Sequence, residues 1–111
     1  MITIDGLKEL GADTAAGMTR CINDEGFYLK MVNMALQDAS FDQLKDAIDA
    51  GDLDTAFEKA HALKGVIGNV GLTPLFDKLA EVTEELRARK EIDYSDYMVA
   101  ISSELEKFRN L

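Results

Sequence analysis

The chain has 111 residues, the length of one domain, and its 47% hydrophobic and 30% charged residues are an ordinary balance for a globular protein in water. Its formal net charge of −9 repels phosphate groups, which argues against a nucleic-acid partner and against binding to an anionic membrane. The single cysteine excludes an internal disulfide framework, and no apolar run approaches the roughly 18 residues that cross a bilayer. Because the opening sequence MITIDGLKEL also lacks the basic start and apolar stretch of a signal peptide, we expect a cytoplasmic protein.

The first part of the chain predicts two short helices followed by a longer one. The short helices are expected over residues 4–10, ending at Gly11, and over residues 13–21. Asn23 is predicted to be the N-cap of the longer helix, over residues 24–39, because two acidic residues follow it in the first turn. The apolar residues of this helix recur at helical spacing, at Phe27, Met31, Met34 and Ala35.

A further helix is expected to begin near Ser40, which can serve as its N-cap, and to close at Gly51. Alternatively, this helix and the preceding one form a single helix with a kink near residues 38–41. The apolar positions of the segment are Phe41, Leu44, Ala47 and Ile48.

Clear start and stop signals bound the remaining helices. Asp52 is predicted to cap a helix that runs to about residue 69 or 70, where Gly71 is a natural stop. Thr73 followed by Pro74 then predicts the start of a helix that continues to about residue 90, since proline suits the first helical turn. A last helix is expected over residues 95–108.

Each of these three helices carries one apolar stripe. The stripe of the first helix is Ala56, Ala60, Leu63 and Ile67, that of the second is Leu75, Leu79, Val82 and Leu86, and that of the third is Met98, Ile101, Leu105 and Phe108. A charged face near the end of the second helix, which includes Arg87 and Arg89, is interpreted as solvated. Since only other helices can cover the stripes, the sequence predicts an all-α fold, an antiparallel up-down four-helix bundle with short extra N-terminal helices. We expect a single domain over residues 1–111, with the short helices at about 4–21 and the bundle at about 24–109. A monomer is expected because every stripe has a partner within the bundle.

The segment HALKG, residues 61–65, contains the only histidine of the chain. On a helical wheel of 100° per residue, Lys64, Gly65 and Gly68 fall within about 60° of His61, whereas the apolar stripe of the same helix lies farther round. The wheel therefore predicts that His61 points outward and does not fill the core. Phe57 lies one turn upstream near the same face, where it is either part of a docking patch or a rim contact with a neighbouring helix.

Two glycines inside a helix are unfavourable, since each destabilises it by roughly 0.5–1 kcal/mol relative to alanine. Their place beside an exposed imidazole indicates that something approaches the helix backbone closely at this face. A histidine ordinarily titrates near neutral pH, so its neutral form is available as a nucleophile, and Lys64 can pair with anionic oxygens that arrive at His61. The chain has no second histidine or cysteine for a metal site. Phosphoryl transfer fits this set of residues best, because its transition state needs positioning and charge stabilisation above all. The plain alternative is an incidental, solvated surface histidine.

The segment AHALKGVIGNVGL, residues 60–72, resembles the signature of histidine-containing phosphotransfer (HPt) domains. That signature is a histidine, a lysine and a glycine three and four positions later, and a further glycine that ends the helix, here His61, Lys64, Gly65 and Gly71. The flanking segments FYLKMVNMAL, AIDAGDLDTAFEKAHALKG and LTPLFDKLAEVTEEL also resemble the family, so that the resemblance covers roughly residues 20–110.

The resemblance implies a phosphorelay intermediate that carries a phosphoryl group on His61 between the aspartates of two receiver domains. Lys64 would steady the phosphoryl oxygens, and Gly65 would allow the receiver to dock. Gly68 is extra to the family's pattern, and we expect it and Phe57 to lie in the same docking patch. The implied partners are response-regulator receiver domains and a hybrid sensor histidine kinase. No cofactor is expected on this chain, which has no glycine-rich phosphate loop for ATP, and the Mg²⁺ would come with the receiver. We therefore expect a phosphocarrier and not an enzyme in the usual sense.

Two other functions fit the same residues. One is a non-catalytic helical adaptor that docks a receiver or a helix, with His61 incidental. The other is the phospho-accepting domain of a longer, chemotaxis-type histidine kinase.

Overall fold

The computed structural model describes all residues, 1–111, and consists of helices and connecting turns without strands. The chain forms seven helices, α1 (Ile4–Glu9), α2 (Thr14–Arg20), α3 (Glu25–Leu36), α4 (Ser40–Asp49), α5 (Leu53–Asn69), α6 (Thr73–Arg87) and α7 (Ser95–Arg109). The all-α prediction is confirmed. No helix is both long enough and apolar enough to cross a membrane.

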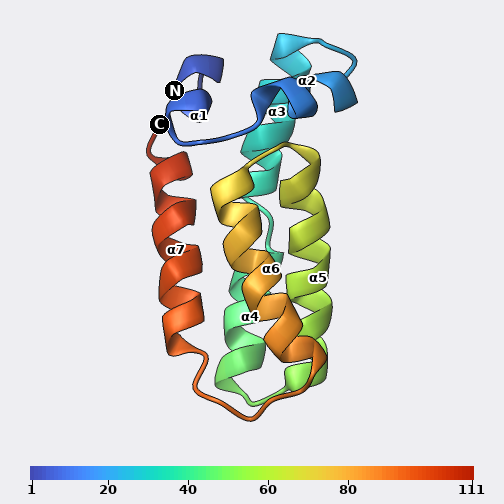
Figure 1. Ribbon diagram of the computed structural model, residues 1–111, viewed down its shortest axis with the longest axis vertical. Coiled ribbons are helices and arrows are strands. Elements are labelled where there is room, and N and C mark those ends of the chain that lie inside the picture. The colour runs from blue at the N-terminus through green and yellow to red at the C-terminus, as the bar shows by residue number, and fades with distance from the viewer.

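The long helices lie side by side in up-down order (Figure 1). Helices α5, α6 and α7 form three rods of the bundle, and α3 followed by α4 forms the fourth. Short turns join consecutive rods, which makes neighbours antiparallel, and the molecule extends over 42 × 23 × 19 Å. Helices α1 and α2 lie at one end of the bundle, beside the junction of α5 and α6 and near the C-terminus (Figure 1).

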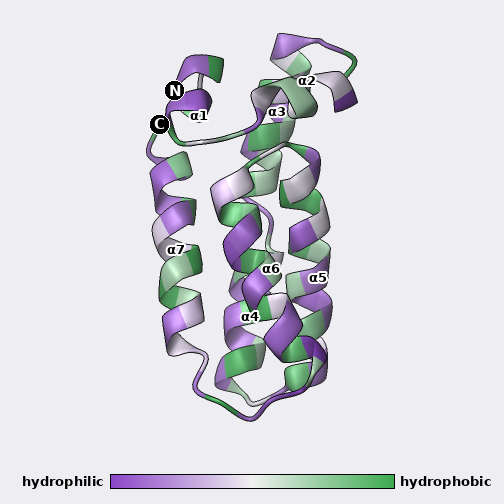
Figure 2. Cartoon of the chain, in the orientation of Figure 1, coloured by the Kyte–Doolittle hydropathy of each residue, from purple (hydrophilic) through white to green (hydrophobic).

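The core lies between the rods and is formed by the stripes that the sequence predicted. In α5 and α6 all eight predicted stripe residues have no exposed surface. In α7, Ile101, Leu105 and Phe108 are buried, and Met98 is partly buried against them. Every long helix carries both hydrophobic and hydrophilic residues, as helices with one buried face do (Figure 2).

Helix α3 buries a stripe that matches the predicted one only in part, at Ala35 and at the partly buried Met31. Its buried residues are Tyr28, Val32, Ala35 and Leu36, whereas Phe27 and Met34 are 45% and 57% exposed. Both sets have helical spacing, so periodicity alone does not choose between them. Tertiary packing decides which residues are buried, since the side of α3 that carries Tyr28 is the one that contacts the end of α5.

Two predicted N-caps were wrong. Asp24, and not Asn23, caps α3 and accepts a hydrogen bond from the Phe27 amide at 3.0 Å. Asn23 has φ 56°, a left-handed conformation that asparagine tolerates in a turn but that lies outside the usual N-cap geometry. Ser40 is the first residue of α4 and its own amide donates to the Asp38 carboxylate at 2.8 Å.

The break between α3 and α4 settles whether the two form one kinked helix: they are separate, with residues 37–39 between them. The C-terminal helix stabilises this break, because Arg109 donates from Nε and Nη2 to the Leu36 carbonyl at 2.9 and 2.6 Å. The Leu36 carbonyl, left without an intrahelical partner, is thereby satisfied.

Candidate functional site

Helix α5 carries the predicted site on its outer face, and both of its ends are fixed. Asp52 is its N-cap, as predicted, and accepts a hydrogen bond from the Thr55 amide at 3.1 Å. Hydrogen bonds from the Thr55 side chain and amide lower the pKa of the Asp52 carboxyl below its ordinary value. At the other end Gly71 adopts φ 73°, the left-handed conformation that lets the chain turn into α6. The α5 stripe packed into the core leaves the opposite face free.

His61 lies on that free face and is exposed, as the helical wheel predicted. Its ring stacks on the ring of Phe57, one turn upstream, with 5.7 Å between centroids and 19° between planes. The histidine is therefore accessible to a partner molecule, yet has a defined aromatic neighbour.

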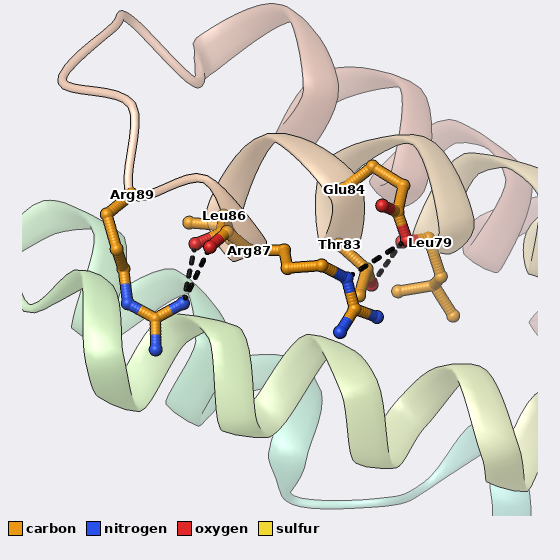
Figure 3. Close-up of polar contacts among 6 residues, drawn as sticks. All are labelled: Leu79, Thr83, Glu84, Leu86, Arg87 and Arg89. Atoms are coloured by element: carbon orange, nitrogen blue, oxygen red, sulfur yellow. Dashed lines mark hydrogen bonds and ion pairs between the residues drawn. The ribbon is translucent and has the colours of Figure 1, made fainter.

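Phe57 is partly buried and is covered by two arginines, Arg87 at the end of α6 and Arg89 in the turn that follows it. The guanidinium carbons of Arg87 and Arg89 lie 5.0 and 4.7 Å from the centre of its ring. Figure 3 shows both arginine side chains reaching toward α5. The sequence leaves two roles open for Phe57, a docking patch or a rim contact with a neighbouring helix. The structure contains the rim contact, made by Arg87 of α6.

Both arginines are themselves held. Arg89 Nε donates to Asp54 Oδ1 at 2.6 Å, and Arg89 Nη1 donates to the Leu86 carbonyl at 2.8 Å. Arg87 Nε pairs with Glu84 Oε1 at 3.3 Å (Figure 3). These residues had been interpreted as a solvated face, which is incomplete, because the guanidinium groups pack on Phe57. No sequence signal pointed to this contact, since the turn after α6 sets it.

Lys64 is partly buried and forms no hydrogen bond or ion pair within the chain. Gly65 is exposed, and a Cβ built on it would meet no atom within 4 Å. The helix therefore presents an unpaired cation and an open stretch of backbone one turn beyond His61. Gly68 differs, because the ring of Phe76 would lie 3.2 Å from its Cβ. The close approach to the backbone at Gly68 is thus made by a side chain of the same molecule.

An open hollow of about 450 Å³ adjoins these residues. Its lining comes from three helices and includes Arg20, Lys64, Gly65, Gly68, Phe76 and Asp77. Arg20 of α2 donates to the carbonyls of Gly68 and Asn69 at 2.8 and 3.3 Å, which places a cation at the C-terminal end of α5. Sequence reasoning missed this contribution of α2, because Arg20 is 48 residues from Gly68 along the chain.

No group of three or more histidine, cysteine, aspartate or glutamate side chains comes together in a way that could hold a metal ion. The chemistry that the site itself offers is that of one imidazole, one free ammonium and an accessible helix face.

Comparison with known proteins agrees with this geometry. The family model for the Hpt domain matches residues 31–111, a range that contains His61 with Lys64 and Gly65 and begins after α1 and α2. Searches of curated proteins and of solved structures gave no match. The match covers most of the chain, and the chain therefore belongs to the Hpt domain family, the phosphotransfer modules of two-component signalling.

Proposed function

We propose that this protein is a phosphorelay intermediate in which His61 accepts a phosphoryl group from the phospho-aspartate of a receiver domain. The donor receiver would belong to a hybrid sensor histidine kinase or to a response regulator. The phosphoryl group then passes to the aspartate of a second receiver, and the reaction is reversible. Such a relay would operate in the cytoplasm.

The observation that carries the proposal is the outer face of α5, where the only histidine of the chain is exposed beside an unpaired lysine and an open glycine. A histidine serving structure would be buried or hydrogen bonded, whereas His61 is exposed and its ring stacks on that of Phe57.

In the transfer step, an imidazole nitrogen of His61 bonds to phosphorus while the bond from phosphorus to the aspartyl oxygen breaks. The carboxylate leaves with the electron pair, and no water enters. Lys64 is one turn from His61, so its ammonium can approach the phosphoryl oxygens and offset their charge in the transition state. Mg²⁺ is proposed to come with the receiver.

Docking requires that the receiver bring its aspartate to His61. The absence of a side chain at Gly65 lets another protein approach the helix axis there. We place Gly68 and Phe57 at the margins of this docking face, where their own contacts with Phe76 and with the two arginines shape the surface.

The test is mass spectrometry of the intact protein after it is mixed with a receiver domain charged by a small-molecule phosphodonor. The wild-type protein is expected to gain one phosphoryl group that is acid-labile and alkali-stable, and His61→Gln is expected to gain none. Circular dichroism should show that the variant folds normally, because His61 is exposed and fills no space in the core. Uptake of acid-labile phosphate by His61→Gln would identify the wrong residue. Binding of receivers without any uptake by the wild type would favour a non-catalytic adaptor.

A further inference from the structure

The stack of Phe57 on His61 has a structural reason. In a helix, aromatic side chains lean toward the N-terminus and lie over the residue four positions earlier. The imidazole of His61 therefore falls beside Phe57, and the 19° between the ring planes with 5.7 Å between the ring centres describes a nearly parallel, offset stack.

A pair of residues four positions apart is a weak restraint by itself, worth a few tenths of a kcal/mol on an isolated helix. Phe57 is different, because its own ring is fixed by a second helix. Arg87 and Arg89 cover it from the end of α6, and Arg89 is anchored in turn to Asp54 and to the Leu86 carbonyl. The exposed His61 thus stacks on a ring whose position is fixed by contacts with residues from another part of the chain.

We propose that Phe57 is a positioning residue for phosphoryl transfer, because its arginine-covered ring holds the imidazole of His61 in one orientation toward the docked receiver. This proposal rests on the phosphotransfer function proposed above. Fixing the nucleophile removes rotational freedom before the partner arrives, and such preorganisation accelerates a step that depends on in-line geometry.

The stack can be measured without any partner, because His61 is the only histidine and gives the only imidazole signals in the NMR spectrum. In the wild type we expect nuclear Overhauser contacts between the two rings and an upfield ring-current displacement of the His61 ring protons. Phe57→Leu should abolish both, and Phe57→Tyr should retain them. His61 signals that are the same in wild type and Phe57→Leu would overturn the proposal.

Transfer kinetics test the consequence. With increasing concentrations of a phosphorylated receiver, Phe57→Leu is expected to lower the limiting first-order transfer rate by about tenfold. The half-saturating receiver concentration should change much less, because Phe57 lies only at the margin of the docking face. Phe57→Tyr should restore the rate. A change confined to the half-saturating concentration would show that Phe57 serves docking, and an unchanged limiting rate would also overturn the positioning role.

Phe41→Leu is the matched control, since it makes the same substitution at a phenylalanine that also lies under an arginine. Phe41 is on α4, and the Arg109 guanidinium carbon is 5.9 Å from its ring centre. This variant should transfer at the wild-type rate even if its stability falls. A similar loss of rate in Phe41→Leu would mean that general loosening of the bundle, and not the stack, explains the effect.

Arg89→Met tests whether the guanidinium group over the Phe57 ring helps to fix that ring, because methionine keeps an apolar side chain and removes the guanidinium. The ring-current displacement of His61 should fall part of the way toward its value in Phe57→Leu, and an unchanged spectrum would remove Arg89 from the proposal.

The proposed phosphotransfer function and the positioning role of Phe57 fail in different ways. A wild-type protein that accepts no phosphoryl group overturns both, whereas normal transfer by Phe57→Leu overturns only this one.

Discussion

At the scale of single residues, His61 and Lys64 share a face but have different surroundings. His61 rests on an aromatic ring, whereas Lys64 has no partner of opposite charge, although the chain has 21 acidic residues. An ammonium that is not neutralised within the molecule remains available to an incoming anion.

We predict that Lys64→Ala slows phosphoryl transfer, by about tenfold for each 1.4 kcal/mol of transition-state stabilisation lost, or shortens the lifetime of the phosphohistidine by removing a charge that stabilises it. Stability should change by no more than about 0.5 kcal/mol, because the side chain forms no ion pair and is not part of the core. Quench-flow measurement of transfer and a denaturant titration would check both parts.

Lys59→Ala is the control for this substitution. It removes the same charge from α5, from a residue that also forms no ion pair and that lies on the far side of the helical wheel from His61. Equal transfer rates in Lys64→Ala and the wild type would remove Lys64 from the mechanism.

At the scale of the element, the glycines of the helices differ in what surrounds them. Gly65 of α5 faces open space, whereas a Cβ at Gly17 of α2 would lie against the Tyr28 ring and 2.8 Å from the Val70 carbonyl oxygen. Gly17 is therefore a packing requirement. Gly65 has no intramolecular reason to be glycine, which is why we assign it to docking.

Gly65→Gln is predicted to raise the stability of the helix and to block transfer. Replacing the glycine should add roughly 0.5–1 kcal/mol to the free energy of unfolding, because the new Cβ lies in open space and helix propensity improves. Thermal melts and the receiver transfer assay would measure the two effects separately. Higher stability together with normal transfer would contradict a docking role for Gly65.

Gly17→Ala provides the comparison for stability. The added methyl group has no room beside Tyr28, so we expect this variant to melt at a lower temperature than the wild type. A higher melting temperature for Gly17→Ala would contradict the packing requirement at Gly17.

Helix α3 is tied to the end of α5 by one buried hydrogen bond. The Tyr28 hydroxyl donates to the Val70 carbonyl at 2.8 Å, and the side chain has no exposed surface. Burial, together with the nearby Cys21 and Asp13, raises the pKa of Tyr28 from its ordinary value of 10.0 to about 12. The fold therefore binds this proton more tightly than the unfolded chain does.

We predict that stability falls as the pH rises from about 10 to 12, because only the unfolded chain loses the Tyr28 proton in that interval. The shift of about two pKa units corresponds to a loss of about 3 kcal/mol in the free energy of unfolding once the pH has reached about 12. Urea titrations at pH 8 and pH 11 would measure the loss.

Tyr28→Phe should be about 1 kcal/mol less stable than wild type at pH 8, since the Val70 carbonyl loses its donor, and should show a weaker alkaline loss. Part of that loss should remain, because burial also raises the pKa of Tyr94. An identical alkaline loss in wild type and variant would show that Tyr28 is not its source.

At the scale of the whole molecule, the N-terminal helices belong to the structure although the family match begins only at residue 31. Leu7 of α1 has no exposed surface, and the Asp13 amide donates to the Gly71 carbonyl at 2.7 Å. The amino group of Met1 also donates to the Leu111 carbonyl at 2.8 Å, so the two ends of the chain meet. These contacts close the end of the bundle where α5 turns into α6.

Removal of residues 1–23 is therefore predicted to lower the melting temperature by about 10 °C. The loss of the buried Leu7 side chain alone represents about 2 kcal/mol of apolar burial, and 1 kcal/mol shifts the melting temperature of a domain near this size by about 4–8 °C. Leu7→Ala in the full chain should lower it in the same direction. An unchanged melting temperature in both proteins would mean that α1 and α2 are an appendage to the bundle.

Several features of this protein follow from the sequence by itself. Asp52, Gly71 and the Thr73–Pro74 pair act on the backbone within one turn, so the bounds of α5 and the start of α6 were predictable. The spacing of 100° per residue also sufficed to place His61, Lys64 and Gly65 on one outward face, because that face depends on the helix alone.

Only the tertiary structure decided which apolar residues α3 buries, that Arg20 reaches the end of α5, and that Arg87 and Arg89, at and just after the end of α6, cover Phe57. Each of these contacts joins residues that are far apart in the chain, and their geometry depends on how turns and neighbouring helices meet. The outward position of His61, the proposed nucleophile, is thus local information. The fixed orientation of the Phe57 ring is not local information, since it depends on the packing of Arg87 and Arg89 against α5.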